Sequence, residues 1–273
     1  MFVWLASYPK SGNTLLRSML AAYFFSKDGI YDFSLIRNIK QFPHGGLFIK
    51  MGIDIKNHNE TVKNYIKTQE SFNKKDAVQF LKTHSYLFNF NKENAFTDFN
   101  NTLGVIYIVR DPRNVVTSFS KYRGLTNEEM ADFMITGSGD GLTWTNNWAS
   151  NFNSWKLFKE HKRYLLIKYE DLINKRELTF LNILNFIHKI TKSKLVLDKE
   201  KFDNTIKTTS FETMQKLEKE NGFSEAGINE RTGEKVPFFN LGPKNDWRQF
   251  LDPAIIQKIE KAFKKEMEEL SYL

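Results

Sequence analysis

The chain has 273 residues, of which 41% are hydrophobic, and its 40 lysines and arginines exceed 32 aspartates and glutamates to give a net charge of +8. This composition is typical of a globular protein with a sizeable core and excludes a chain that is disordered throughout. The absence of cysteine excludes disulfide scaffolds, thiolate metal sites and cysteine nucleophiles. The positive charge favours an anionic ligand, although a general abundance of lysine explains it equally well.

Four short apolar runs predict buried parallel strands, and helical patterns follow most of them. In chain order the predicted strands are Phe2–Ser7, Val78–Thr83, Gly104–Val109 and Tyr164–Lys168. The predicted helices are Thr14–Phe25, Arg113–Tyr122, Asp171–Ile187 and Pro253–Leu270. This alternation indicates an α/β fold, a single domain over residues 1–273 with a central parallel sheet flanked by helices. Residues 26–75 and 123–150 are less regular, and we expect them to form the walls of a substrate pocket.

No apolar stretch is long enough to cross a bilayer. The longest, Leu103–Val109, is far shorter than the roughly 20 residues that a spanning helix needs. The N-terminus also lacks the basic start and long apolar region of a signal peptide. We therefore expect no membrane span and a cytoplasmic location. The basic residues form no long run, which counts against a nucleic-acid partner, and the oligomeric state stays open.

A polar loop connects the first predicted strand directly to the first helix. Its sequence over residues 7–14 is Ser-Tyr-Pro-Lys-Ser-Gly-Asn-Thr. Such a strand–loop–helix unit is an anion site, because loop N–H groups and the helix N-terminus face the ligand. Lys10 adds a charge, Ser11 and Thr14 add hydroxyl donors, and Gly12 allows a phosphate to approach the backbone closely. The loop lacks the GxxxxGK[ST] pattern of nucleotide triphosphatases, and an ordinary polar turn remains the alternative.

This loop resembles the 5′-phosphosulfate loop of sulfotransferases that use 3′-phosphoadenosine 5′-phosphosulfate (PAPS). Tyr8 to Gly12 and Thr14 match the family's pattern, whereas Asn13 replaces a threonine and Leu15 stands where tryptophan is common. The change at Leu15 implies different packing against the adenine but leaves the phosphate cradle. The resemblance therefore assigns a P-loop-like, donor-binding role to Lys10, Ser11, Gly12, Asn13, Thr14 and Leu15.

The third predicted strand ends in Arg110-Asp111-Pro112-Arg113-Asn114, and Ser118 lies eight residues after Arg110. This resembles the family's 3′-phosphate motif, in which an arginine at a strand end and a serine on the next helix hold the phosphate. Arginine offers a planar fork to two phosphate oxygens. The alternative is that Arg110 and Arg113 pair with surface carboxylates.

The second predicted strand ends in Lys82-Thr83-His84, which resembles the family's Lys-Thr-His segment with its catalytic base. Histidine suits that role because its ordinary pKa, about 6.5, is near neutral pH. The remaining histidines show no partner pattern and no metal-ligand spacing, so we expect structural or surface roles and no metal site. They are His44, His58, His161 and His188.

Two later segments resemble the family's adenine-binding pieces. The resemblance implies that Tyr169, in the Tyr-Glu-Asp-Leu turn, reaches the adenine and that Thr209 and Phe211 lie around the ring. An aromatic side chain is a suitable purine contact, and core packing is the alternative.

Residues 242–248 resemble the family's closing loop, which assigns donor binding to Gly242 and Lys244. Asn240 and Leu241, however, occupy the positions of an arginine–lysine pair that helps to hold the 3′-phosphate in the family. The basic residues that would compensate are Lys244, Arg248, Arg231 and Lys235.

The resemblance covers about residues 2–252 and implies sulfuryl transfer from PAPS to a hydroxyl or amine of a small-molecule or carbohydrate acceptor. His84 is then the general base, Lys10 stabilises charge on the bridging oxygen and the leaving adenosine bisphosphate, and Lys82 is a second cation at the sulfuryl group, with no metal. Two alternatives are a nucleotide-dependent, P-loop kinase-like enzyme and a non-catalytic anion-binding module. For the acceptor, tryptophans 144, 148 and 155 have the spacing of one helix face, which indicates either core packing or an aromatic platform.

Overall fold

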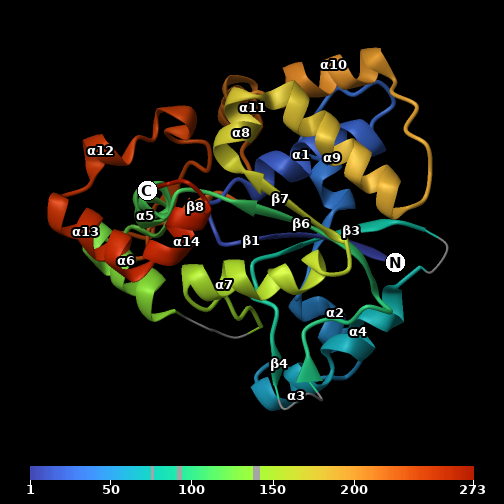
Figure 1. Ribbon diagram of the computed structural model, residues 1–273, viewed down its shortest axis with the longest axis horizontal. Coiled ribbons are helices and arrows are strands. Elements are labelled where there is room, and N and C mark those ends of the chain that lie inside the picture. Colours follow the sequence, from blue (N-terminus) through green and yellow to red (C-terminus); the bar gives the residue numbers. More distant parts are fainter. Residues whose placement is uncertain (75–76, 91–93, 138–141) are drawn as a thin grey trace.

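A five-stranded parallel sheet forms the centre of the computed structural model, which describes residues 1–74, 77–90, 94–137 and 142–273 (Figure 1). The strand order is β2-β3-β1-β6-β7. The bounds are β1 Phe2–Ser7, β2 Lys40–Gln41, β3 Gln79–Thr83, β6 Thr102–Val109 and β7 Tyr164–Lys168. All four predicted strands are therefore confirmed. The edge strand β2 was not predicted, because its two residues are exposed and carry no apolar pattern.

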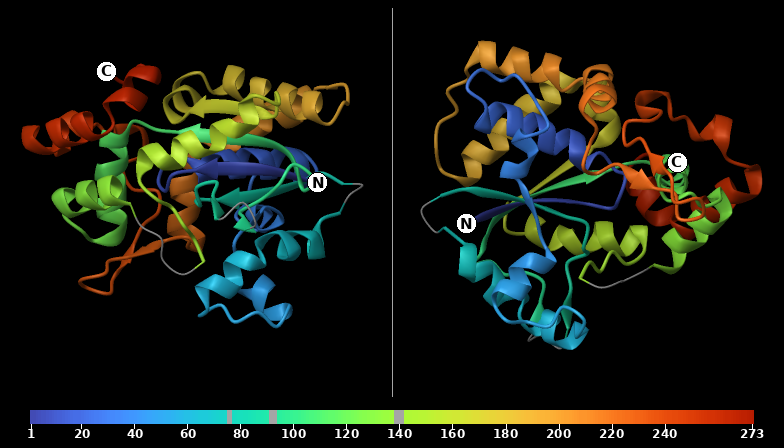
Figure 2. Two further views of the ribbon diagram at one scale, coloured as in Figure 1. Left: turned by 60° about the horizontal axis from the view of Figure 1, so that its bottom comes forward. Right: turned by 180° about the vertical axis from the view of Figure 1, so that it is seen from behind.

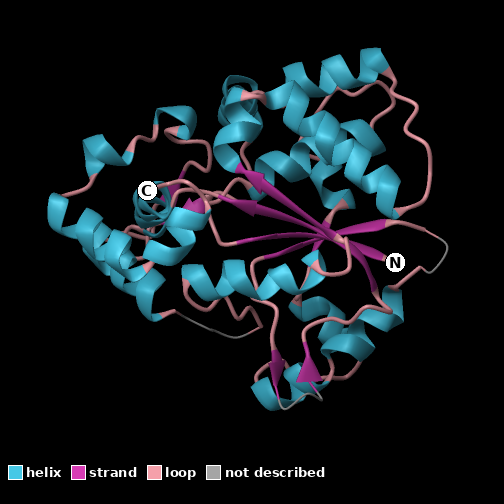
Figure 3. Cartoon of the chain, in the orientation of Figure 1, coloured by secondary structure: helices cyan, strands magenta, loops and turns pink. Residues whose placement is uncertain are grey.

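Strand β1 is buried on both faces of the sheet, which explains its continuous apolar sequence. Val3 and Leu5 contribute to the core on one face, and Trp4 and Ala6 contribute to the core on the other. Helices therefore cover both faces, as the α/β prediction requires (Figure 3).

The helical layers on the two faces come from different parts of the chain (Figure 2). One face carries α1 (Asn13–Phe25), α9 (Arg176–Ile190) and α10 (Lys199–Thr208). The opposite face carries α2 (Gly45–Lys50), α3 (His58–Lys63), α4 (Tyr65–Phe72) and α7 (Trp148–Trp155).

A third group of helices lies beyond the carboxyl ends of the strands (Figure 1). It comprises α5 (Pro112–Arg123), α6 (Asn127–Thr136), α12 (Trp247–Phe250), α13 (Pro253–Ala262) and α14 (Lys264–Glu269). The remaining α-helices are α8 (Tyr169–Asn174) and α11 (Phe211–Asn221). Three short 3-10 helices span Leu35–Asn38, Lys156–Lys159 and Gly242–Lys244. Two small antiparallel ribbons pair β4 (Asn89–Phe90) with β5 (Asn94–Ala95) and β8 (Gly227–Ile228) with β9 (Lys235–Val236). Within the described ranges, no helix has both the length and the apolar character to cross a bilayer.

Two predicted helices are each divided in the structure. The segment predicted as Asp171–Ile187 is interrupted at Lys175, and the segment Pro253–Leu270 is interrupted at Phe263, because neither residue has helical backbone angles. The structure also shows where the spaced tryptophans lie. Asn147 caps α7 by accepting from the Ser150 N–H, so the helix contains Trp148 and Trp155 but not Trp144. Both are fully buried, which confirms core packing for these two.

Candidate active site

The predicted site residues converge at the carboxyl ends of four strands. The loop with Lys10 follows β1, His84 follows β3, Arg110 follows β6 and Tyr169 follows β7. Strand β1 lies between β3 and β6, and at such a switch point the connections diverge and leave a crevice that favours ligand binding. A cavity of about 440 Å³ lies at this place.

Most predicted site residues line this cavity. They are Lys10, Gly12, Asn13, Thr14, Leu15, Lys82, His84, Arg110, Ser118, Tyr169, Phe211 and Gly242. Three others do not. Ser11 is fully buried, Thr209 is bonded to Arg176 and to a helix carbonyl, and Lys244 is exposed.

The backbone of the loop before α1 suits an anion. Lys10 and Gly12 have positive φ angles of 62° and 99°, and a Cβ at Gly12 would overlap the Tyr169 ring, so only glycine permits this packing. The first turn of α1 contains no acidic residue and has no side-chain cap. Its N–H groups and the positive end of the helix dipole are therefore available to an anionic ligand.

His84 has the geometry of a base. Its Nδ1 lies 3.0 Å from the main-chain oxygen of Ser7, and because a carbonyl oxygen only accepts, Nδ1 carries the proton and the lone pair is on Nε2. Desolvation and the nearby Lys82 charge lower the pKa of His84 to about 3, so its imidazole is neutral at physiological pH.

Two lysines bring positive charge into the cavity at an energetic cost. Desolvation, followed by the Arg110 charge, lowers the pKa of Lys10 to about 7, and desolvation lowers the pKa of Lys82 to about 8. The Lys10 ammonium lies 4.2 Å from the ring centre of Tyr122 and 3.9 Å from that of Phe238. These cation–π contacts keep the charged form in place.

Glu225 is a cavity residue that no sequence motif indicated. Its carboxylate accepts hydrogen bonds from Thr14 Oγ1 at 3.0 Å and Arg17 Nη1 at 2.5 Å, and it lies 3.7 Å from Lys82 Nζ. Burial alone would raise the pKa of Glu225, but Lys82 and Arg17 outweigh it and lower the pKa to about 2. The pairing could not be predicted locally, because Glu225 and Arg17 are 208 positions apart.

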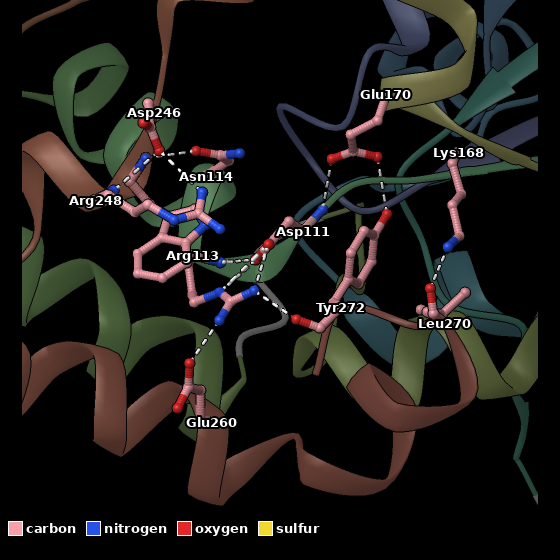
Figure 4. A network of polar contacts seen from close by, with 11 residues as sticks. Asp111, Arg113, Asn114, Lys168, Glu170, Asp246, Arg248, Glu260, Leu270 and Tyr272 are labelled. Carbon is pink, nitrogen blue, oxygen red and sulfur yellow. Dashed lines mark hydrogen bonds and ion pairs between the residues drawn. The ribbon is translucent and has the colours of Figure 1, made fainter.

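The two arginines of the 3′-phosphate motif have different roles. Arg113 pairs with Asp111 at 2.7 Å and Glu260 at 2.5 Å, so the carboxylate-pairing alternative is confirmed for Arg113 (Figure 4). Arg110 donates to the main-chain oxygen of Lys10 at 3.2 Å and its guanidinium lies 4.2 Å from the Tyr169 ring centre. Its Nε is buried and has no hydrogen-bond partner within the described part of the chain.

The residues proposed to replace the family's arginine–lysine pair lie elsewhere. None of the four candidates lines the cavity, namely Lys244, Arg248, Arg231 and Lys235. Asn240 and Leu241 do line it, and so does Lys121, which lies on α5 one turn after Ser118. The Lys121 ammonium lies 4.5 Å from the ring centre of Phe250, and the isolated position of Lys121 outside any motif gave no signal in the sequence.

The walls of this cavity come mostly from segments outside residues 26–75 and 123–150. Among the described residues, only Gln41 of 26–75 and none of 123–150 lines the cavity; residues 75 and 138–141 lie outside the described ranges. The cover is formed instead by Glu225 and residues 236–242. The expectation for the walls of an acceptor pocket stays a prediction, because this cavity is the one at the loop that contains Lys10.

A family model described as "Sulfotransferase domain" matches residues 2–271. The chain belongs to the sulfotransferase family. This sulfotransferase domain is 25% identical over 176 residues to sulfotransferase 2A1 of Macaca fascicularis, a match of 63% of this chain and 59% of the relative. It is 26% identical to the 3-beta-hydroxysteroid sulfotransferase of Cavia porcellus, over 62% of this chain and 58% of the relative. The matches thus span less than two thirds of these relatives' own length.

Solved structures support the same fold. The mouse sulfotransferase SULT7A1, solved in complex with PAP (adenosine 3′,5′-bisphosphate), superposes with a TM-score of 0.60 at 18% identity, over 97% of this sulfotransferase chain and 83% of its own. A retinol dehydratase solved with androsterone and PAP gives 0.58 at 17% identity, over 97% and 80%. The predicted α/β fold is therefore confirmed.

The residues present fit a nucleotide with several negative charges. Ser11 Oγ and Arg110 Nε are buried polar atoms without partners among the described residues. A Cβ at Gly12 or at Gly242 would overlap an aromatic ring, Tyr169 or Phe211, so both glycines allow a ring to lie close to the backbone. Nothing in the described ranges groups three or more metal-ligating side chains.

Proposed function

We propose that the cavity binds PAPS and that the protein transfers the sulfuryl group to a hydroxyl or amine of a small-molecule or carbohydrate acceptor. One observation carries this proposal: a histidine, two lysines and an arginine from the ends of β1, β3 and β6 line one cavity. The membership of the family and the steroid and amine sulfotransferases among the relatives support it.

Each part of the cavity suits one part of the donor. The loop N–H groups at Ser11 to Thr14 suit the 5′-phosphate, and Arg110 with Ser118 suits the 3′-phosphate. The rings of Tyr169 and Phe211 offer apolar faces to the adenine.

Bound PAPS would supply an activated sulfuryl group next to the base. His84 Nε2 accepts the proton of the acceptor hydroxyl or amine while the new bond to sulfur forms and the sulfur–oxygen bond to PAP breaks. Lys10 stabilises the negative charge that develops on the leaving phosphate oxygen, and Lys82 is a second cation at the sulfuryl group.

The proposal extends to the compartment. We propose a cytoplasmic location, because a chain without cysteine has no disulfides and disulfides are rare in proteins of the reducing cytoplasm.

Replacement of the base tests the function. His84→Ala is expected to retain PAP affinity but lose about 10²–10⁴-fold in turnover, because general-base catalysis typically contributes that much. Turnover is measured at saturating PAPS with a panel of phenol, alcohol and amine acceptors. His188→Ala is the control, since His188 lies on α9 and bonds to Ser193. Near wild-type turnover in His84→Ala would remove His84 from the mechanism.

A further inference from the structure

Ser7 connects the proposed base to the phosphate loop. It is the last residue of β1, is fully buried, and presents two oxygens to His84. Nδ1 of His84 lies 3.0 Å from the Ser7 main-chain oxygen and 3.1 Å from Ser7 Oγ. The ring nitrogen that faces away from the proposed reaction is thus held at two points.

Asn13 holds the Ser7 hydroxyl in turn. Its Nδ2 donates to the Leu5 main-chain oxygen at 2.8 Å and to Ser7 Oγ at 3.1 Å, so both amide protons are used beneath the loop. The side chain of Asn13 therefore supports β1, while its main chain begins α1 in the proposed phosphate site.

The donor and acceptor pattern of this group selects one tautomer of His84. If Nδ1 lacked its proton, its lone pair would face the lone pairs of the Ser7 carbonyl oxygen at hydrogen-bond distance. With the proton on Nδ1, the N–H group donates a hydrogen bond to the Ser7 oxygens, which also stabilise the imidazolium that forms when Nε2 takes up a proton. Asn151 Nδ2 fixes the main chain at the same place by donating to the His84 oxygen at 2.9 Å.

We propose that Ser7 and Asn13 are positioning residues that hold His84 with its proton on Nδ1 and its free lone pair on Nε2. This inference rests on the proposed function, in which His84 is the base. Asn13, where the family commonly has threonine, then links the donor loop to the base through a single side chain.

The decisive variants change only the Ser7 hydroxyl. Ser7→Ala removes it, and Ser7→Thr restores a hydroxyl at the same position as a conservative rescue. Ser18→Ala is the matched control, because Ser18 is an equally buried serine on α1 whose hydroxyl forms no hydrogen bond with His84 or Asn13. Thermal unfolding of all three shows whether each variant is folded.

Two readouts separate positioning from general stability. In the full-length protein, ¹⁵N NMR of labelled histidine, assigned by the missing signal in His84→Ala, is expected to show Nδ1 protonated and Nε2 unprotonated. In Ser7→Ala the Ser7 carbonyl still accepts from Nδ1, so we expect the same tautomer but a fall in kcat of about 3- to 10-fold, the size of one hydrogen bond to the imidazolium, with the KM for PAPS unchanged. Ser7→Thr and Ser18→Ala are expected to retain wild-type values.

A His84 proton on Nε2 in the wild type, or an unchanged kcat in folded Ser7→Ala, would overturn the proposal. A loss of kcat in Ser18→Ala equal to that in Ser7→Ala would overturn it as well. The NMR result does not depend on activity. If His84→Ala retained turnover, the proposed function of His84 would fail, whereas the tautomer assignment would stand or fall on its own spectrum.

Discussion

Before an anion binds, the pKa values of the two cavity lysines lie near neutral pH. The pKa of Lys10 is lowered to about 7 by desolvation and by Arg110, and that of Lys82 is lowered to about 8 by desolvation. A bound polyanion favours the charged forms and raises both values again. Ligand binding should therefore be coupled to protonation of these lysines near neutral pH, where an ordinary lysine is already fully charged.

Proton uptake on ligand binding tests this coupling. At pH 8 most of the Lys10 population is neutral, so PAP binding is expected to take up protons, whereas at pH 6 Lys10 is already charged and contributes none. Calorimetry in two buffers with different ionisation enthalpies measures the number of protons.

Lys10→Met separates the contribution of Lys10 from that of Lys82. The variant should lose the Lys10 share of the uptake at pH 8, and its single-turnover rate should fall more strongly than its PAPS affinity, because the loop N–H groups remain. Unchanged proton uptake would show that Lys10 does not change its protonation when PAP binds. Loss of PAPS affinity with an unchanged single-turnover rate would make Lys10 a simple binding residue.

A second prediction concerns the cation that serves the 3′-phosphate. Lys121 lines the cavity near Ser118, whereas Lys244 lies outside it. Lys121→Met is therefore expected to weaken PAP about 3- to 10-fold and to leave 5′-AMP unchanged, a larger effect on PAP than Lys244→Met produces. Titration of both variants with both ligands decides between the two lysines, and a larger effect of Lys244→Met would return the role to the closing loop.

At the scale of elements, the turn from β6 to α5 is held by the C-terminal helices. Arg113, near the start of α5, contacts Glu260 on α13 and the main-chain oxygen of Tyr272, and Tyr272 donates to Glu170 at 2.9 Å (Figure 4). Glu170 in turn accepts from the Asp111 N–H. The residue after Arg110 is therefore fixed from α8 and from the C-terminal segment.

Removal of Arg113 should cost stability. Its side chain is 6% exposed and its loss leaves Asp111 buried without this cation, so Arg113→Met is expected to lower the free energy of unfolding by about 3 kcal/mol. Arg248→Met is the matched control, because Arg248 contacts the same Trp247 ring but forms an exposed ion pair with Asp246. An exposed pair contributes about 0–1 kcal/mol. Chemical denaturation measures the free energy of unfolding of both variants. Equal decreases would show that burial of the Arg113 ion pairs does not add to stability.

The features of the whole fold that could be predicted from the sequence are those that short-range patterns determine. Apolar runs located the four main strands, and motifs at their carboxyl ends located the loop of Lys10, His84 and Arg110, because parallel strands bring those ends together. The sequence could not predict the pairing of Glu225 with Arg17, or that residues 236–242 cover the cavity. Those contacts depend on how long loops return over the sheet, which no local periodicity records. The separate roles of Arg110 and Arg113 likewise depend on Glu260, far along the chain.

A calorimetric titration with PAP, 5′-AMP and ATP tests the central claim, that this cavity is a PAPS site. We predict that PAP binds without added metal and at least about tenfold more tightly than 5′-AMP, since Arg110 and its neighbours add charge-assisted contacts to the 3′-phosphate. Arg110→Ala should remove most of that difference and leave 5′-AMP nearly unchanged. Tighter binding of ATP with Mg²⁺ than of PAP, or equal weakening of PAP and 5′-AMP by Arg110→Ala, would contradict the account.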